Sequence, residues 1–257
     1  MTAFTKYQAG TPCWVDVSTP DLDATRAFYG PLFGWTTQPG PGGAAGGHAT
    51  FLLGGKRVAA AAPVEPGRAG GWTTYLASDD VEETAARVIA AGGAVVTGPL
   101  EVPDAGRVLV ARDPVGASFG AWEAGAQIGA AVANAPGSLV WNELVTADAT
   151  TATAFLQRVF DYAIETTDVG QPEAYRMLLV DGRPVAGVLQ PGDARPGTSH
   201  WLTYFAVADT DATCAHVADL GGRVTYGPTD TVYGRLAVVA DTTGARFAVI
   251  AGTDDTV

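Results

Sequence analysis

The chain has few cysteines and histidines. Its 257 residues include two cysteines and three histidines. Cys13 and Cys214 have no CxxC or Cys/His spacing around them, which argues against a redox pair or a clustered metal site. We expect two buried thiols.

Positive charge is also scarce. Lysine and arginine together number 15 against 27 acidic residues, and the net charge is −12. The basic residues are scattered, so nucleic acid and anionic membranes are not expected partners. The N-terminal sequence MTAFTKYQAG has no apolar core of a signal peptide, and no stretch approaches the roughly 18 apolar residues of a membrane span. We therefore expect a cytoplasmic protein.

A long internal repeat is the main positive feature. WVDVSTPDLDATRAFYGPLFGW, beginning at Trp14, returns as WNELVTADATTATAFLQRVFDY, beginning 127 residues later at Trp141. Trp72 and Trp201 are related in the same way, 129 residues apart. A repeat of this length predicts two homologous domains in tandem. A hydrophobic content of 47% is enough for two ordinary cores.

Within each half, one order of elements occurs twice. A short strand, Cys13 to Ser18, precedes a helix that we expect Thr19 to cap, with Pro20 at the first helical position and Asp21 in the first turn. Gly34 should end this helix. The domain boundaries that follow are 1–123 for the first domain (modules about 11–65 and 70–123), 124–137 for a linker, and 138–257 for the second domain (modules about 138–192 and 199–252).

The predicted fold class is α+β, with four βαβββ modules. One helix cannot cover both faces of a module's small sheet. Two modules side by side solve this by forming a curved, largely antiparallel sheet, a cup with its helices outside. The concave inner face of such a cup suits a small molecule.

The repeated motifs resemble the vicinal oxygen chelate superfamily, which includes glyoxalase I, extradiol dioxygenases, fosfomycin-resistance enzymes and bleomycin-binding proteins. The resemblance is carried by TPDLDATRAFYGPLFGW, YLASDDVEE and DPVGASFGAWE with their second copies, and it covers nearly the whole chain. It is nearest to tandem actinobacterial members called hydroxylases or glyoxalase-like proteins. It implies two glyoxalase-like domains, and it fixes architecture more firmly than activity.

The resemblance also locates a metal site. Metal-dependent members hold a divalent ion with an inward His, Gln or Glu on the first strand of each module and a Glu near the end of each last strand. The corresponding positions in this chain are Trp14, Thr73, Trp141, Leu202, Gly120 and Ala248. Because a catalytic metal normally needs three well-placed ligands, we expect no metal or other cofactor. The alternative is a lyase or dioxygenase with nickel, zinc, iron or manganese, whose ligands lie one residue out of this register.

Other side chains remain on the expected inner faces. Strand alternation places Trp14 beside Asp16, and Trp141 beside Glu143. An aromatic beside a carboxylate could hold a planar polycyclic ligand by stacking and anchor its hydroxyl or cation. The tryptophans could equally fill space once held by a metal and its waters.

The remaining lining is apolar and aromatic. The expected inward residues are Thr73, Tyr75, Gly120, Trp122, Leu202, Tyr204 and Ala248. Such pockets suit bulky ligands, and ordinary core packing is the alternative. The stretch GPGGAAGG at residues 40–47 lacks the context of a phosphate loop, and we interpret it as a flap over the first cup.

Asp16, Glu143 and His200 are the candidate catalytic residues. His200 precedes the strand that carries Leu202 and shares its parity, so it could transfer a proton inside the second cup. A surface role in hydrogen bonding is the alternative for this histidine.

Four functions are compatible with these features. The first is a metal-independent protein that binds a bulky aromatic or polyketide-like molecule, in sequestration or secondary metabolism. The second is a metal-independent acid–base enzyme, such as an isomerase, cyclase or hydroxylase-type protein, acting on a biosynthetic intermediate. The third is the metal-dependent lyase or dioxygenase, and the fourth is a dimerisation or signalling platform. The chain could be a monomer or a homodimer.

Overall fold

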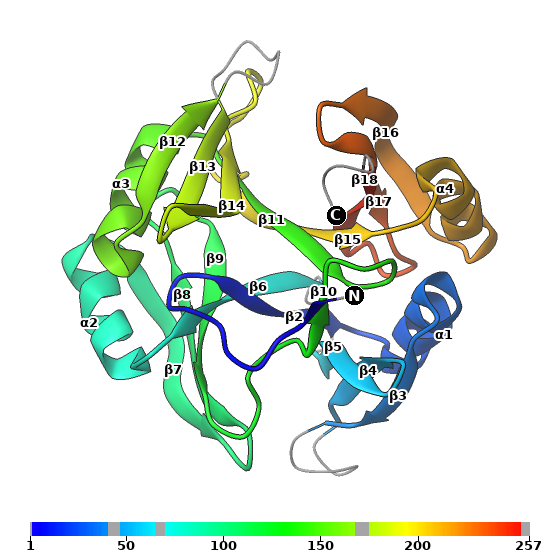
Figure 1. Ribbon diagram of the computed structural model, residues 1–257, viewed down its shortest axis with the longest axis horizontal. Coiled ribbons are helices and arrows are strands. Elements are labelled where there is room, and N and C mark those ends of the chain that lie inside the picture. The colour runs from blue at the N-terminus through cyan, green and yellow to red at the C-terminus, as the bar shows by residue number, and fades with distance from the viewer. Residues whose placement is uncertain (1, 41–46, 65–69, 168–174, 253–257) are drawn as a thin grey trace.

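The computed structural model describes residues 2–40, 47–64, 70–167 and 175–252. Two curved, open, mixed sheets dominate it, with helices paired on two sides (Figure 1). The expected α+β fold is confirmed. Among the described residues, no helix has the length and apolar character needed to cross a membrane.

The first sheet comes from the first half of the chain. Its strands in spatial order are β3 (Thr36–Pro39), β4 (Ala49–Leu53), β5 (Lys56–Pro63), β2 (Pro12–Thr19), β6 (Gly71–Ser78), β9 (Ser118–Ala124), β8 (Gly106–Arg112) and β7 (Ala94–Val102). The first strands of the two modules, β2 and β6, pair antiparallel at its centre.

The second sheet repeats this order. Its strands are β12 (Ala163–Thr167), β13 (Tyr175–Val180), β14 (Arg183–Leu189), β11 (Leu139–Val145), β15 (His200–Ala206), β18 (Arg246–Gly252), β17 (Gly234–Ala240) and β16 (Arg223–Thr231). Here β11 and β15 form the central antiparallel pair.

In the described part of the chain there are four helices, and each has an aspartate as its N-cap. The helices are α1 (Leu22–Phe33), α2 (Val81–Ala90), α3 (Ala149–Phe160) and α4 (Thr210–Asp219). The side chains that accept first-turn backbone N–H groups belong to Asp21, Asp80, Asp148 and Asp209.

The prediction that Thr19 caps the first helix is wrong, and so is the placement of Pro20 and Asp21 inside that helix. Strand β2 continues through Thr19, which pairs with Pro63. The helix therefore starts two residues later, with Asp21 as its N-cap. Gly34 ends it in the left-handed conformation, φ 69°, as expected.

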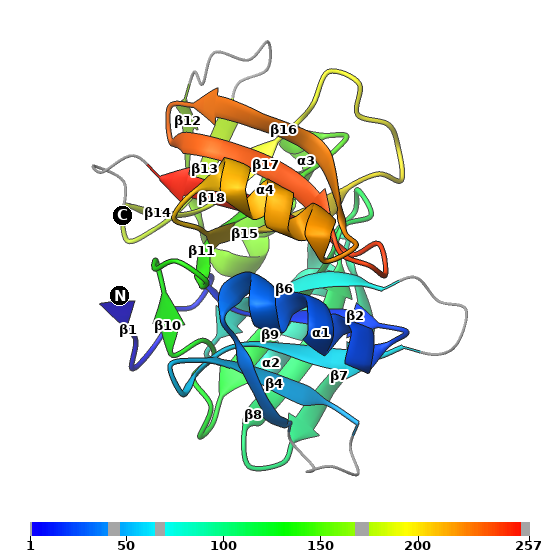
Figure 2. The same ribbon diagram turned by 90° about the vertical axis from the view of Figure 1, so that its right-hand side faces the viewer.

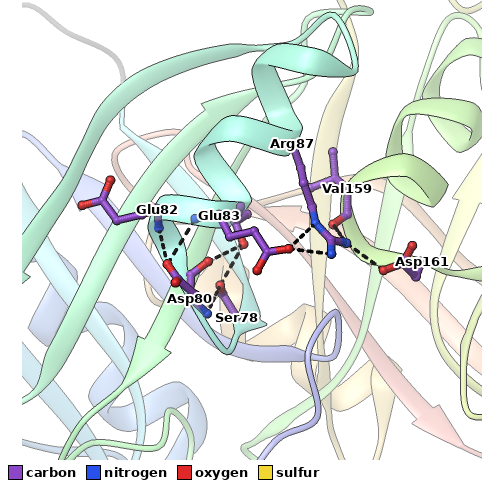
Figure 3. A network of polar contacts seen from close by, with 8 residues as sticks. Ser78, Asp80, Glu82, Glu83, Arg87, Val159 and Asp161 are labelled. Atoms are coloured by element: carbon purple, nitrogen blue, oxygen red, sulfur yellow. Dashed lines mark hydrogen bonds and ion pairs between the residues drawn. The ribbon is translucent and has the colours of Figure 1, made fainter.

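The helices lie on the convex sides of both sheets and are shared between the two halves. Figure 2 shows α1 and α4 side by side, and α2 contacts α3 on the other side of the molecule. The close-up in Figure 3 shows Arg87 on α2, which pairs with Glu83 and Asp161 at 2.7 Å each. Arg87 thereby links α2 to the C-terminal end of α3.

A cluster of aromatic side chains fills the space beside α1 and joins the two halves. It comprises Phe28, Tyr29, Phe33, Trp35, Phe51, Trp72, Phe205 and Phe247. The hydroxyl of Tyr29 donates to Asp241 Oδ2 at 3.0 Å and accepts from Trp72 Nε1 at 3.0 Å. The two repeats therefore share this core cluster. Both cysteines are free and buried, as expected.

The N-terminal segment and the linker pack against each other. The short strands are β1 (Thr2–Ala3) and β10 (Val132–Ala133), which pair antiparallel, and β10 also pairs with β11. Tyr7 donates from its hydroxyl to Ala130 O at 2.7 Å. The region expected to be a linker thus contains a strand and contributes buried residues to the core.

Candidate functional site

The concave face of the first sheet, called cup 1, carries the aromatic residues that strand alternation places there. Trp14 pairs with Tyr75 across the central strands, and Asp16 pairs with Thr73. The Tyr75 hydroxyl donates to Asp16 Oδ2 at 2.7 Å. Trp122 lies in the same cluster as Trp14 and Tyr75.

Gly120 lies directly under the ring of Tyr75. The two residues are register partners on β9 and β6. A Cβ atom built at Gly120 would lie 2.0 Å from Tyr75 Cδ1 and 2.4 Å from its Cε1, far inside contact distance. The tyrosine ring therefore occupies the space that any side chain at position 120 would enter.

The carboxyl group of Asp16 is half-buried, and burial raises its pKa to about 6. Hydrogen bonds from Tyr75 and Thr73 oppose this rise, as does the nearby His48. Sequence reasoning did not place His48 in the site. The signal for it lies in the repeat, because His48 precedes β4 and its counterpart 127 residues later is Tyr175 in the second cup.

The concave face of the second sheet, called cup 2, repeats the arrangement. Trp141 pairs with Tyr204, Glu143 with Leu202, and Tyr204 with Ala248. Apart from Trp141, which is half-buried, these residues are buried, and Glu143 is only 7% exposed.

Two tyrosines hold the carboxylate of Glu143. Tyr204 donates from its hydroxyl to Glu143 Oε1 at 3.2 Å. Tyr175 hydrogen-bonds the same carboxylate and accepts from Trp141 Nε1 at 3.0 Å. Burial raises the pKa of Glu143, and the two tyrosine hydrogen bonds oppose the rise.

Tyr175 is a site residue that sequence reasoning missed. It lies at the start of β13, next to residues 168–174, which are outside the described part of the chain. Gly187 on β14 leaves room for it: a Cβ atom there would lie 1.7 Å from the Tyr175 hydroxyl. In both cups a glycine thus makes room for a tyrosine that hydrogen-bonds the carboxylate.

His200 lies at the start of β15, opposite Val145 at the end of β11. It shares the concave face with Leu202, but its Nδ1 hydrogen-bonds Thr198 O at 2.8 Å. Among the described residues, the hydrogen-bond partners of Glu143 are Tyr204 and Tyr175, and His200 is not one of them.

Two cavities lie outside these carboxylate clusters. One, of about 210 Å³, is beside Trp122 and is also lined by Tyr7 and Ile128. The other, of about 340 Å³, lies between the end of α1 and the side of α4. Residues 41–46 of the expected flap lie outside the described residues.

Comparisons with known proteins agree with the two-cup architecture. Residues 14–121 match the model of a glyoxalase-like domain, and residues 138–249 match the glyoxalase/bleomycin resistance protein/dioxygenase superfamily. CFP32 of Mycobacterium tuberculosis, which is named as a glyoxylase, is 40% identical over 95% of this chain and 96% of its own length. The chain belongs to the glyoxalase/bleomycin resistance/dioxygenase superfamily.

Two further comparisons are informative. DnrV of Streptomyces peucetius, named as an anthracycline biosynthesis protein, is 38% identical, covering 96% of this chain and 94% of its own. The 2,3-dioxygenase LapB from Pseudomonas sp. KL28 superposes with a TM-score of 0.66 at 14% identity, covering 96% of this chain and 94% of its own. The likeness to LapB concerns the fold alone.

The positions at which the resemblance implies metal ligands carry no His, Cys, Asp or Glu in this chain. They hold Trp14, Thr73 and Gly120 in cup 1 and Trp141, Leu202 and Ala248 in cup 2. Across the described residues, no three His, Cys, Asp or Glu side chains lie close enough together to form a metal site. The Tyr75 ring further blocks the last-strand position in cup 1.

Proposed function

We propose that this member of the superfamily binds a bulky aromatic or polyketide-like small molecule without a metal, in sequestration or secondary metabolism. The observation that carries the proposal is that aromatic residues recur beside a carboxylate on the concave face of both cups. A tryptophan, a tyrosine and a carboxylate recur together at equivalent positions: Trp14, Tyr75 and Asp16 in cup 1, and Trp141, Tyr204 and Glu143 in cup 2.

This set of groups supports recognition of a planar ligand. Aromatic side chains offer flat apolar area for stacking, and a carboxylate fixes the orientation of a ligand hydroxyl or amine. The relatives named as anthracycline biosynthesis proteins support a role in secondary metabolism.

Tryptophan fluorescence tests the proposal, because Trp141 adjoins the carboxylate cluster. Chelator-treated protein would be titrated with a series of hydroxylated anthraquinones and with single-ring phenols as a size control. We expect saturable quenching by the polycyclic compounds, with single-ring phenols binding far more weakly. Quenching that is absent for the whole series, or that requires an added divalent ion, contradicts the proposal.

A second function, metal-independent acid–base catalysis, is favoured by the same buried carboxylates. Asp16, with its pKa near 6, can be protonated or ionised close to neutral pH, as a general acid or base requires. If the protein is such an enzyme, Asp16→Asn or Glu143→Gln should abolish turnover of a bound biosynthetic intermediate and leave its affinity largely intact. Loss of affinity in a protein that has no turnover supports the binding function instead.

A further inference from the structure

The two cups differ in what covers them. In cup 1, Phe4, Tyr7 and Ile128 pack onto the cluster that contains Trp14 and Trp122. These covering residues come from the N-terminal segment and the linker. The aromatic part of cup 1 is therefore already in contact with the chain's own side chains.

Hydrogen bonds hold the N-terminal segment in this position. Gly10 N donates to Ala77 O at 2.8 Å, and Gln8 Nε2 donates to Asp181 Oδ2 at 2.7 Å. The Tyr162 hydroxyl, from the second half of the chain, donates to Gly10 O. The other end of the segment, β1, pairs with β10, so a ligand would have to displace an anchored segment to stack on Trp14.

Cup 2 instead presents aromatic residues to solvent. Tyr226 on β16 is 57% exposed, and Tyr233 in the turn between β16 and β17 is 37% exposed. Tyr226 is the register partner of Val238, which pairs with Ala248, so its ring shares the concave face with Tyr204. Exposed aromatics gathered on one concave face are typical of a binding surface.

Tyr233 extends this surface toward the opposite edge of the sheet. The charge of Glu165 on β12 contributes to raising the pKa of Tyr233, after burial, and Tyr233 in turn lies within electrostatic reach of Tyr175. Strands β12 and β16 are the two outer strands of the sheet. The turn after β16 therefore brings Tyr233 near Glu165 on β12 and near Tyr175, which hydrogen-bonds Glu143.

The chemistry at the base of cup 2 is that of an acceptor. A carboxylate offers about four lone-pair sites, and Tyr204 and Tyr175 use two of them. A ligand that supplies a further O–H or N–H group would donate a hydrogen bond to Glu143. An ether oxygen at the same place is itself an acceptor, so it could form no hydrogen bond with the carboxylate.

We infer that cup 2 alone takes the aromatic ligand, between Trp141 and Tyr226, and that this ligand is a planar aromatic compound whose hydroxyl group donates to Glu143. The inference rests on the proposed function and narrows it to one site per chain and one ligand chemistry.

Calorimetric titration with 2-hydroxyanthraquinone and its partner 2-methoxyanthraquinone tests the inference. Wild-type protein should bind one hydroxy compound per chain, and the methoxy compound about tenfold or more weakly, since a hydrogen bond to a charged group is lost. Glu143→Gln should abolish most of this preference. Tyr226→Ala should weaken binding of both compounds about tenfold through lost stacking. Because Tyr226 is exposed, its truncation leaves the core unchanged.

Thr97→Ala is the matched control in cup 1. Thr97 pairs with Val110 as Tyr226 pairs with Val238, so the two residues hold equivalent places in the two sheets. This variant should bind like wild type. Two ligands per chain, or an affinity that falls with Thr97→Ala or Asp16→Asn and not with Tyr226→Ala, would overturn the inference while leaving the proposed function intact. Failure of wild-type protein to bind any polycyclic aromatic would overturn both.

Discussion

Adding one methyl group to Gly120 should destabilise the protein strongly. In Gly120→Ala the new Cβ would lie 2.0 Å from a ring atom of Tyr75, so the ring must move. That ring is buried, and its hydroxyl is held by Asp16 at 2.7 Å. Overpacking costs about 1–3 kcal/mol, and losing a hydrogen bond to a charged group costs about 1.5–3 kcal/mol. We expect the free energy of unfolding to fall by roughly 3 kcal/mol.

Urea denaturation of single and double variants measures this effect. In a Tyr75→Ala background the ring is gone, so Gly120→Ala should then cost less than about 1 kcal/mol, a coupling typical of residues in contact. A cost for Gly120→Ala below about 0.5 kcal/mol, or an equal cost in both backgrounds, would refute the reasoning that the tyrosine ring fills the former side-chain space.

Three further variants test other parts of the structure. The fold favours the protonated form of Asp16, whose pKa is about 6 against the usual 3.8. As the pH rises from about 4 to 7, the free energy of unfolding of wild type should therefore fall by about 3 kcal/mol relative to that of Asp16→Asn. A difference in stability that stays constant across this range contradicts the assignment. Tyr29→Phe removes the donor to Oδ2 of Asp241, which is 1% exposed, while Thr243 and Ala245 still donate to its Oδ1. This variant should lower the free energy of unfolding by about 2 kcal/mol. Arg87→Ala removes the exposed ion pairs with Glu83 and Asp161 and a long hydrogen bond to Val159 O at 3.4 Å, and should cost under about 1 kcal/mol, less still in high salt. Urea titrations of the two variants measure both effects. If Arg87→Ala lowers the free energy of unfolding more than Tyr29→Phe does, the two halves are not held together mainly by their shared core.

The repeat and the strand alternation were sufficient to predict the architecture. Residues on one strand face were correctly grouped, because Trp14 and Asp16 are two apart and the period of a strand is two. The start of the first helix was placed two residues too early, because Thr19 is also a good capping residue but remained in its strand.

Other features depend on contacts that a local pattern does not contain. Strands β3 and β12 are short, mostly polar edge strands, so they lack the apolar alternation that identifies a strand. The cover over cup 1 depends on Tyr7 meeting Ala130, 123 residues away. Tyr175 and Tyr226 were missed because each lies where the sequence of the two repeats differs, opposite His48 and Thr97.

Metal content tests the central claim most directly, namely that aromatic residues have taken the place of the metal in both cups. Untagged protein, purified without chelators and then incubated with nickel, zinc, iron or manganese and dialysed, would be measured by plasma mass spectrometry. The account predicts no stoichiometric metal under any of these conditions. About one divalent ion per chain that resists dialysis would contradict it, because binding of that strength needs a set of three or more protein ligands.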